Sequence, residues 1–322
     1  MRSRVLAAIA LGAVISFIQP ACASAPMAAP QASGYYRIMV GDIEVTALSD
    51  GTIDFPMDTL LRGESPAQIR AAFAKAFQKL PAESSMNQFL VNTGSRLVLV
   101  DTGAGAFYGP TLGNTVASLR AAGYTPEQVD EVVITHMHAD HTGGLVHDGK
   151  PAFPNAIVRI ARAEVDFWMN PANESLVPEG VRGSFAVARQ ALAPYIAAGR
   201  LKPFVGETEI VPGIRALPAP GHTAGHTYYA VESKGETLLA WGDAVHAAAV
   251  QFADPTVFIA WDSDGRGARA AREKALADAA RKGYLVAGAH LPFPGVGHVS
   301  RAVDGKGYVF VPVAYTVNRR AH

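Results

Sequence analysis

Cysteine is almost absent from this sequence: Cys22 is the only one in 322 residues. If the N-terminal segment that holds it is removed, no thiol remains to serve as a metal ligand or as a nucleophile. A chain without free thiols suits an oxidising compartment, where an unpaired cysteine is reactive.

Charged residues are also few. They make up 17% of the sequence, with 28 basic and 28 acidic residues, and no basic run or stripe appears. Nucleic acid is therefore not an expected partner, because its recognition needs clustered lysine and arginine. The apolar share of 49% is enough for a large buried core, and residues 35–322 are predicted to form one catalytic domain.

No apolar run is long enough to span a membrane comfortably. The apolar segment Val5–Ile18 follows Arg2 and Arg4 and precedes the small residues Ala21-Cys22-Ala23. This order is typical of an export signal, so residues 1–23 are predicted to be a signal peptide that is cleaved after Ala23.

Other fates of the N-terminus are less favoured. A lipoprotein anchored through Cys22 is the second choice, because Gln19 and Pro20 stand where such a signal has an aliphatic and a small residue. An uncleaved anchor is less favoured than cleavage. Residues 24–34, rich in Ala, Pro and Ser, are expected to be a flexible mature N-terminus. The mature protein would then be periplasmic or secreted and free of the membrane.

The hydrophobic pattern predicts strands that alternate with helices. Strands are expected within Arg37–Ser49, Val129–Thr135, Ile210–Leu217 and Tyr284–Ala287, the last being the final strand before His290. Helices are expected at residues 66–79, 112–122, 185–198 and 266–282. This order favours an α/β fold of two stacked sheets flanked by helices, an αββα sandwich.

Chemistry concentrates in Thr135-His136-Met137-His138-Ala139-Asp140-His141, directly after a predicted strand. A lone histidine usually packs in a core, but three imidazoles and a carboxylate at this spacing are rarely accidental. The spacing suits two neighbouring metal ions better than one. These ligand types fit zinc, and also iron or manganese.

The HxHxDH segment resembles the hallmark of the metallo-β-lactamase superfamily. Further segments match that superfamily in order: Val100-Asp101-Thr102-Gly103, Pro220-Gly221-His222-Thr223-Ala224-Gly225-His226, Gly242-Asp243 and Gly288-Ala289-His290. The match spans nearly all of the predicted mature chain.

The resemblance implies two divalent metal ions, with zinc expected and iron or manganese as alternatives. The first ion would be bound by His136, His138 and His222. The second would be bound by Asp140, His141 and His290, with Asp243 bridging both. Asp101 and His226 would orient ligands without binding metal.

A closer resemblance is to methyl parathion hydrolase and its lactonase-like and arylesterase-like relatives. It is carried by the segments Tyr35-Tyr36-Arg37, Thr46–Gly51, Leu90–Gly94, Phe252–Pro255 and His290–His298. The resemblance implies an exported, binuclear homodimer.

The expected substrate pocket differs from that of the organophosphate-hydrolysing members. They carry an arginine near Leu60, a leucine in place of His246, and smaller residues in place of Ile259 and Trp261. A bulkier pocket favours a flat acyl substrate over a branched phosphotriester. The expected pocket residues are Leu60, Tyr108, Trp168, Phe185, His246, Ile259 and Trp261.

The leading hypothesis is hydrolysis of a lactone or an aryl ester, in which a hydroxide between the metals attacks the carbonyl carbon. Asp140 would pass a proton to the leaving group and Asp243 would hold both metals. Phosphotriester hydrolysis is the second hypothesis. β-Lactam hydrolysis is disfavoured by Asp243, and a non-catalytic exported binding protein by the complete ligand set.

Overall fold

The computed structural model describes residues 34–303 and 305–316. The predicted signal peptide at residues 1–23, and all of residues 24–34 except Gly34, lie outside this part. Within the described residues, no helix is both long and apolar enough to cross a membrane.

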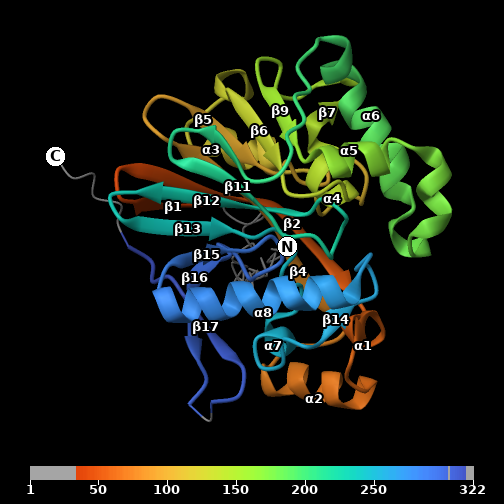
Figure 1. Cartoon of the computed structure of the whole chain (residues 1–322), viewed down its shortest axis with the longest axis vertical. Coiled ribbons are helices and arrows are strands. Elements are labelled where there is room, and N and C mark those ends of the chain that lie inside the picture. Colours follow the sequence, from red (N-terminus) through yellow and green to blue (C-terminus); the bar gives the residue numbers. More distant parts are fainter. Residues whose placement is uncertain (1–33, 304, 317–322) are drawn as a thin grey trace, which may run out of the picture. The chain divides into compact units, whose positions relative to one another are not determined.

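Two large mixed sheets form the centre of the fold (Figure 1). The first has the strand order β1-β2-β4-β5-β6-β9, and the second has the order β10-β11-β12-β13-β15-β16-β17. The first sheet contains β1 (Tyr35–Val40), β2 (Ile43–Phe55), β4 (Ala82–Asn92), β5 (Leu97–Val100), β6 (Glu131–Ile134) and β9 (Ile157–Ile160). The second contains β10 (Thr208–Val211), β11 (Ile214–Pro218), β12 (Thr227–Ser233), β13 (Glu236–Ala240), β15 (Leu285–Ala287), β16 (Val296–Arg301) and β17 (Tyr308–Pro312).

Helices α3 (Thr115–Ala121), α5 (Arg162–Trp168) and α6 (Gly183–Ala197) cover the outer face of the first sheet, and α8 (Gly265–Lys282) covers that of the second. The short helix α4 (Ala139–Thr142) follows the end of β6, and α1 (Met57–Leu60), α2 (Pro66–Lys75) and α7 (Ala248–Gln251) pack together in a separate cluster. Two short strand pairs complete the described structure: β3 (Leu61–Arg62) with β14 (Phe258–Ile259), and β7 (Val146–His147) with β8 (Lys150–Pro151).

The core follows from strands that are apolar on both faces. In β5, Val98 and Val100 belong to the core between the sheets, whereas Leu97 and Leu99 face α3, α5 and α6. Strand side chains alternate between faces, so one short apolar run serves two layers. Leu276 of α8 packs in a third core on the outer face of the second sheet. These layers confirm the predicted αββα sandwich.

One expectation about the strands is wrong. The predicted strand Ile210–Leu217 is a hairpin of β10 and β11, because Gly213 takes a positive φ of 87° and reverses the chain. The predicted strand Tyr284–Ala287 corresponds to β15, which is the final strand before His290 as expected. After His290, β16 and β17 add two antiparallel strands to the sheet.

Candidate metal centre

The expected metal ligands leave their strands at one end of the two sheets. Strand β6 pairs in parallel with β5 and β9, and the segment His136–His141 begins directly after it. Strand β13 pairs in parallel with β15, so Asp243 and His290 follow neighbouring strand ends in the second sheet. His222 lies in the loop between β11 and β12. The topology therefore brings side chains from four loops together.

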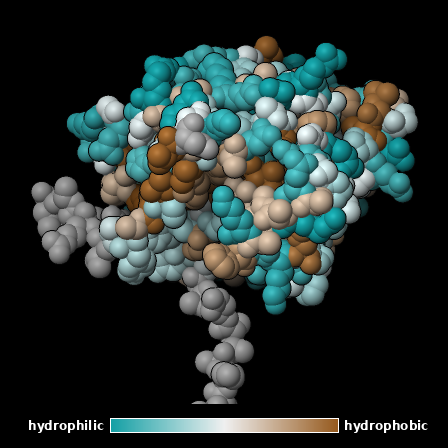
Figure 2. Space-filling view, turned by 90° about the horizontal axis from the view of Figure 1, so that it is seen from below, coloured by the Kyte–Doolittle hydropathy of each residue, from teal (hydrophilic) through white to brown (hydrophobic). Residues whose placement is uncertain are grey.

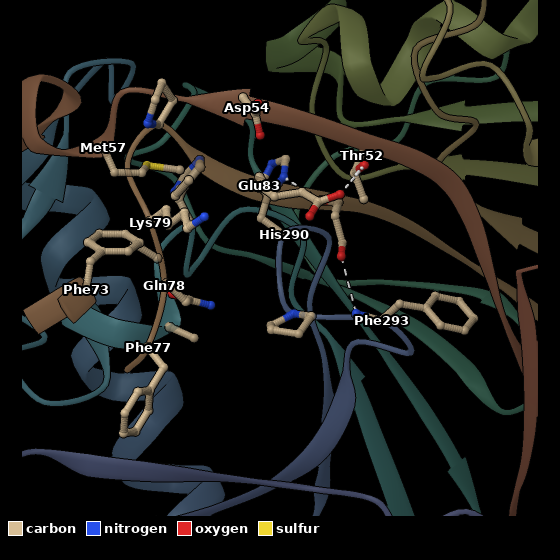
Figure 3. Close-up of a pocket in the computed structure, with 18 residues that line it drawn as sticks. Thr52, Asp54, Met57, Phe73, Phe77, Gln78, Lys79, Glu83, His290 and Phe293 are labelled. Atoms are coloured by element: carbon tan, nitrogen blue, oxygen red, sulfur yellow. Dashed lines mark hydrogen bonds between the residues drawn. The ribbon is translucent and has the colours of Figure 1, made fainter. Parts of the chain in front are cut away.

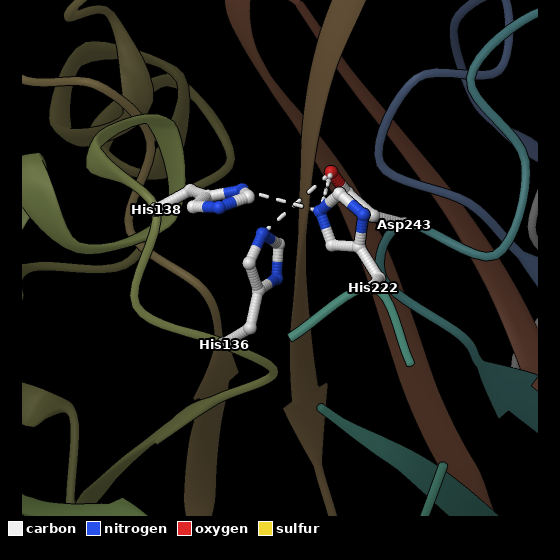
Figure 4. Close-up of side chains that lie close together, drawn as sticks. All are labelled: His136, His138, His222 and Asp243. Carbon is white, nitrogen blue, oxygen red and sulfur yellow. Dashed lines mark hydrogen bonds and ion pairs between the residues drawn. The ribbon is translucent and has the colours of Figure 1, made fainter. Parts of the chain in front are cut away.

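The first group contains His136, His138, His222 and Asp243, whose ligand atoms lie close enough to hold one ion. His222 Nε2 lies 3.1 Å from His138 Nδ1 and 3.3 Å from Asp243 Oδ2. His136 Nε2 lies 3.6 Å from the same carboxylate oxygen. Figure 4 shows the three imidazoles directed toward one another and toward Asp243.

The second group contains Asp140, His141 and His290. Asp140 Oδ2 lies 3.6 Å from His141 Nε2 and 3.7 Å from His290 Nε2. Asp243 touches this group as well, because its Oδ1 is 3.1 Å from His141 Nε2 and its Oδ2 is 3.0 Å from His290 Nε2. The structure thus places Asp243 between the two groups.

The buried polar atoms of this cluster fit bound cations. Nε2 of His136, Nε2 of His141 and Oδ1 of Asp243 are buried and have no partner with hydrogen-bond geometry in the described part of the chain. Buried polar atoms are nearly always paired, so unpaired donor atoms that converge call for an ion between them. Imidazole nitrogen and carboxylate oxygen are the ligands that zinc accepts.

The charges of the cluster are strongly coupled. Burial works to raise the pKa of Asp243, but His290 and His141 outweigh it and hold that pKa well below its usual value. Burial and the neighbouring His141 lower the pKa of His136 well below its usual value. These shifts favour the ionised form of Asp243 and the neutral form of His136, the forms in which these groups bind a metal. Asp243 has the opposite effect on His141 and His222, whose pKa values it raises.

Two aspartates hold imidazoles of the cluster from outside. Asp101 Oδ2 accepts from His141 Nδ1 at 2.8 Å, and its Oδ1 accepts from the backbone N–H of Thr135 at 2.8 Å. Asp262 Oδ1 accepts from His222 Nδ1 at 2.7 Å. Such partners fix the orientation and tautomer of a ligand histidine. The sequence motif indicated the role of Asp101, whereas nothing in the sequence singled out Asp262.

His246 lies beside Asp243, with its Nε2 3.0 Å from Asp243 Oδ2. Asp243, His246 and His290 could in principle form a third ion-binding group. However, His246 Nδ1 is buried and has no partner in the described chain, whereas a metal-bound histidine usually donates through its outer nitrogen. An ionised carboxylate can only accept, so His246 donates its Nε2–H to Asp243.

Two cavities flank the cluster. The smaller has a volume of about 80 Å³ and is lined by His138, Asp140 and Asp243 together with Phe55, Tyr108, Gly180, Val181 and Trp261. The larger, of about 670 Å³, reaches His246 and His290 from the other side. Figure 3 shows this larger cavity, with Met57 and Phe73 on one side and Thr52 and Phe293 on the other.

Figure 2 shows one outer face of the protein, where separate apolar areas alternate with polar ones.

The expected pocket residues are only partly brought together. Tyr108 and Trp261 line the small cavity, and His246 lines the large one. Trp168, Phe185 and Ile259 are fully buried in the hydrophobic cores. The Trp168 ring packs between His138 and Phe185, with ring centroids 5.2 Å and 4.6 Å away. Leu60 packs at the edge of the core that contains Ile259.

Residues 83–305, more than half of the chain, match the metallo-beta-lactamase superfamily. The chain belongs to this superfamily. The family expected from the HxHxDH motif is therefore confirmed.

Curated relatives of the chain include two lactonases. An N-acyl homoserine lactonase of Bacillus cereus is 27% identical over 149 residues, which are 46% of this chain and 51% of that enzyme. An N-acyl homoserine lactonase of Bacillus sp is 30% identical over 123 residues, which are 38% of this chain and 41% of the relative. The chain thus spans about half or less of the length of these relatives.

Solved structures resemble the chain over most of its length. The hydrolase AbOPH of the beta lactamase superfamily is 37% identical with a TM-score of 0.84, covering 89% of this chain and 100% of that one. AidC, a dizinc quorum-quenching lactonase in complex with the product N-hexanoyl-L-homoserine, is 28% identical with a TM-score of 0.81, covering 88% and 99%. The chain thus has the fold of the metallo-β-lactamase superfamily of metal-dependent hydrolases, and its two ligand groups fit two divalent ions.

Proposed function

We propose that this protein is an exported dizinc lactonase that also accepts aryl esters. The proposal is carried by the complete ligand set with Asp243 between its two groups, in a chain that resembles a dizinc lactonase over 88% of its length. Export and a homodimeric state belong to the same proposal. A native mass spectrum of the exported protein tests both, since it should show a dimer of chains that begin at Ser24.

Two divalent ions in these groups supply a Lewis acid for the substrate carbonyl and an acidified water as nucleophile. The side chain of Asp140 lines the small cavity and is 13% exposed. Its carboxylate takes the proton of the attacking water as the new carbon–oxygen bond forms. It then delivers that proton to the leaving alkoxide as the ester bond breaks, which yields a hydroxy acid.

Tyr108 lines the same cavity and completes the polar wall around the reacting carbonyl. Burial and the nearby charge of Asp140 raise the pKa of Tyr108. The phenol therefore keeps its proton and donates a hydrogen bond to an oxygen of the substrate, where negative charge develops.

The walls of the small cavity favour a planar substrate group over a branched one. Phe55, Val181 and Trp261 line this cavity beside Asp140, and their apolar side chains suit the ring of an aryl ester or a lactone. A phosphotriester spreads three substituents around a tetrahedral phosphorus and needs more room. Phosphotriester hydrolysis is the second candidate, because the same ligand set can serve a phosphoryl centre.

A substrate panel tests the proposal. The zinc-loaded protein should show a higher kcat/KM for dihydrocoumarin or an aryl acetate than for methyl parathion. Trp261 lines the small cavity, and the ring of His246 packs against it at 5.8 Å between centroids. Replacing both with leucine should widen the cavity and shift the ratio toward the phosphotriester, since the walls set the relative transition-state stabilities. A native preference for methyl parathion, or an unchanged ratio in the double variant, would contradict the proposal.

A further inference from the structure

A buried carboxylate on α5 joins the two loops that supply the first ligand group. Glu164 is fully buried. Its Oε2 accepts from the backbone N–H of Met137 at 2.9 Å, and its Oε1 accepts from the backbone N–H of Gly225 at 2.6 Å. Met137 stands between His136 and His138, and Gly225 stands three residues after His222. Glu164 therefore connects both sides of the first group without belonging to it.

Glu164 has no ion pair with any lysine, arginine or histidine of the described chain. An isolated carboxylate in a protein interior is costly unless its oxygens accept hydrogen bonds. The two backbone N–H groups provide this compensation, and each of the two oxygens serves a different loop. Because each oxygen is bonded to a different loop, Glu164 holds the two loops at a fixed separation.

The backbone of the second loop is shaped for this contact. A Cβ on Gly225 would lie 2.8 Å from the backbone nitrogen of Glu164 and 2.9 Å from its Cγ. Only glycine lets the loop approach α5 closely enough to donate its N–H. The short contact thus depends on residues on both sides.

Trp168 adds a second contact from the same face of α5. It follows Glu164 by four residues, so both side chains point to the same side of the helix. The Trp168 ring lies 5.2 Å from the His138 ring at an interplanar angle of 82°. Helix α5 therefore touches the first ligand group at two places.

We propose that Glu164 is a positioning residue for the first metal ion: through Met137 and Gly225 it sets the distance between His136 and His138 on one loop and His222 on the other. The inference rests on the proposed metal-dependent function, but not on any particular substrate. Loss of this link lowers the affinity of the first group and leaves the second group, formed by Asp140, His141 and His290, intact.

Three variants test the proposal. Glu164→Gln keeps the shape but turns an amide NH₂ toward one of the two N–H donors. Gly225→Ala disturbs the same contact from the other loop, and it gives an independent test if the first variant folds poorly. Asp166→Asn is the matched control, because it makes the same carboxylate-to-amide change on the exposed face of α5. Zinc affinity is measured by chelator competition, and cobalt(II) absorption spectra report the two groups.

Glu164→Gln and Gly225→Ala should each lower the affinity for one of the two zinc ions by about tenfold or more. The cobalt(II) spectrum should lose the contribution of the first group and keep that of the second, and Asp166→Asn should match the unmodified protein. The proposal is overturned if both variants retain both affinities, if they weaken both ions equally, or if Asp166→Asn has the same effect. Because metal binding is measured apart from turnover, a protein that binds two zinc ions but opens no lactone would refute the proposed function and leave this inference standing.

Discussion

At the scale of single residues, Asp101 and Asp262 have matching roles on opposite sides of the centre. Each accepts a hydrogen bond from the outer nitrogen of one ligand, His141 or His222. We expect Asp101→Asn to lower the affinity for the second ion, and Asp262→Asn to lower the affinity for the first ion. Each loss should be about 10- to 100-fold, because an amide orients the imidazole less firmly. Zinc competition titrations of both variants measure the effect. A loss at the same ion in both variants would contradict this division of roles.

Asp243 carries the charge that both groups share. Asp243→Asn keeps the shape of the side chain but removes a negative charge from between two cations. We expect the variant to retain about one metal ion per chain and to lose at least ~100-fold in kcat/KM. Elemental analysis and lactone kinetics on one preparation check this together. Full occupancy with ordinary activity would show that Asp243 is not the bridge.

Part of the ligand cluster could be predicted from a short, dense motif, whereas His222, Asp243 and His290 followed only from the family resemblance. Four of the ligands fall within His136–His141, and the spacing itself indicates a metal. Asp262 and Glu164 could not be predicted in this way, because each is a single carboxylate whose partner lies far along the chain. Their roles appear only when the fold brings them to His222 or to Met137 and Gly225. Nothing in the sequence separates the aromatic residues that line a cavity from those, such as Trp168, that pack behind a ligand.

At the scale of elements, α8 holds the segment between β13 and α8, which carries Asp243 and Asp262. Arg272 is buried, and its guanidinium donates to the backbone oxygens of Ala244, Pro255 and Val257 at 2.7–3.0 Å. Arg272→Met would remove the donor to the carbonyl groups of Ala244 and Pro255, whereas that of Val257 keeps the hydrogen bond from the Gln251 side-chain amide. We expect a loss of about 3 kcal/mol in the free energy of unfolding, measured by urea denaturation.

Arg269 on the same helix gives a matched control. Its side chain is 48% exposed and pairs with Glu273 at 3.0 Å. Arg269→Met should change the free energy of unfolding by less than about 1 kcal/mol, as expected for a surface ion pair. Equal losses in both variants would mean that Arg272 acts through general helix stability and not through the loop.

The elements that sequence patterns predict well have apolar residues on both faces, such as β6, or helical periodicity, such as α8. The strands β16 and β17 were missed for a physical reason. β17 lies at the edge of the second sheet, and β16 carries the polar residues His298, Ser300 and Arg301, so their pattern does not resemble a buried strand. The sequence pattern of β10 and β11 resembles one continuous strand, because the turn between them is only Pro212-Gly213.

At the scale of the whole molecule, the metal centre links the two sheets. His136–His141 follow a strand of the first sheet, whereas Asp243 and His290 follow strands of the second. Each ion bound between them should stabilise the folded state by mass action, by about 2.7 kcal/mol when free zinc is 100 times the Kd of its site. Chelation should therefore lower Tm, and zinc should restore it. An unchanged Tm after verified metal removal would contradict this coupling.

The two-metal centre is proposed to open lactones, and this can be measured on one protein sample. The rate of dihydrocoumarin hydrolysis is compared for the protein as purified, after chelation, and after stepwise return of zinc. We expect activity to disappear on chelation and to return with about two zinc ions per chain. Lactone hydrolysis that persists without metal, or its absence from the fully zinc-loaded protein, would contradict the proposal.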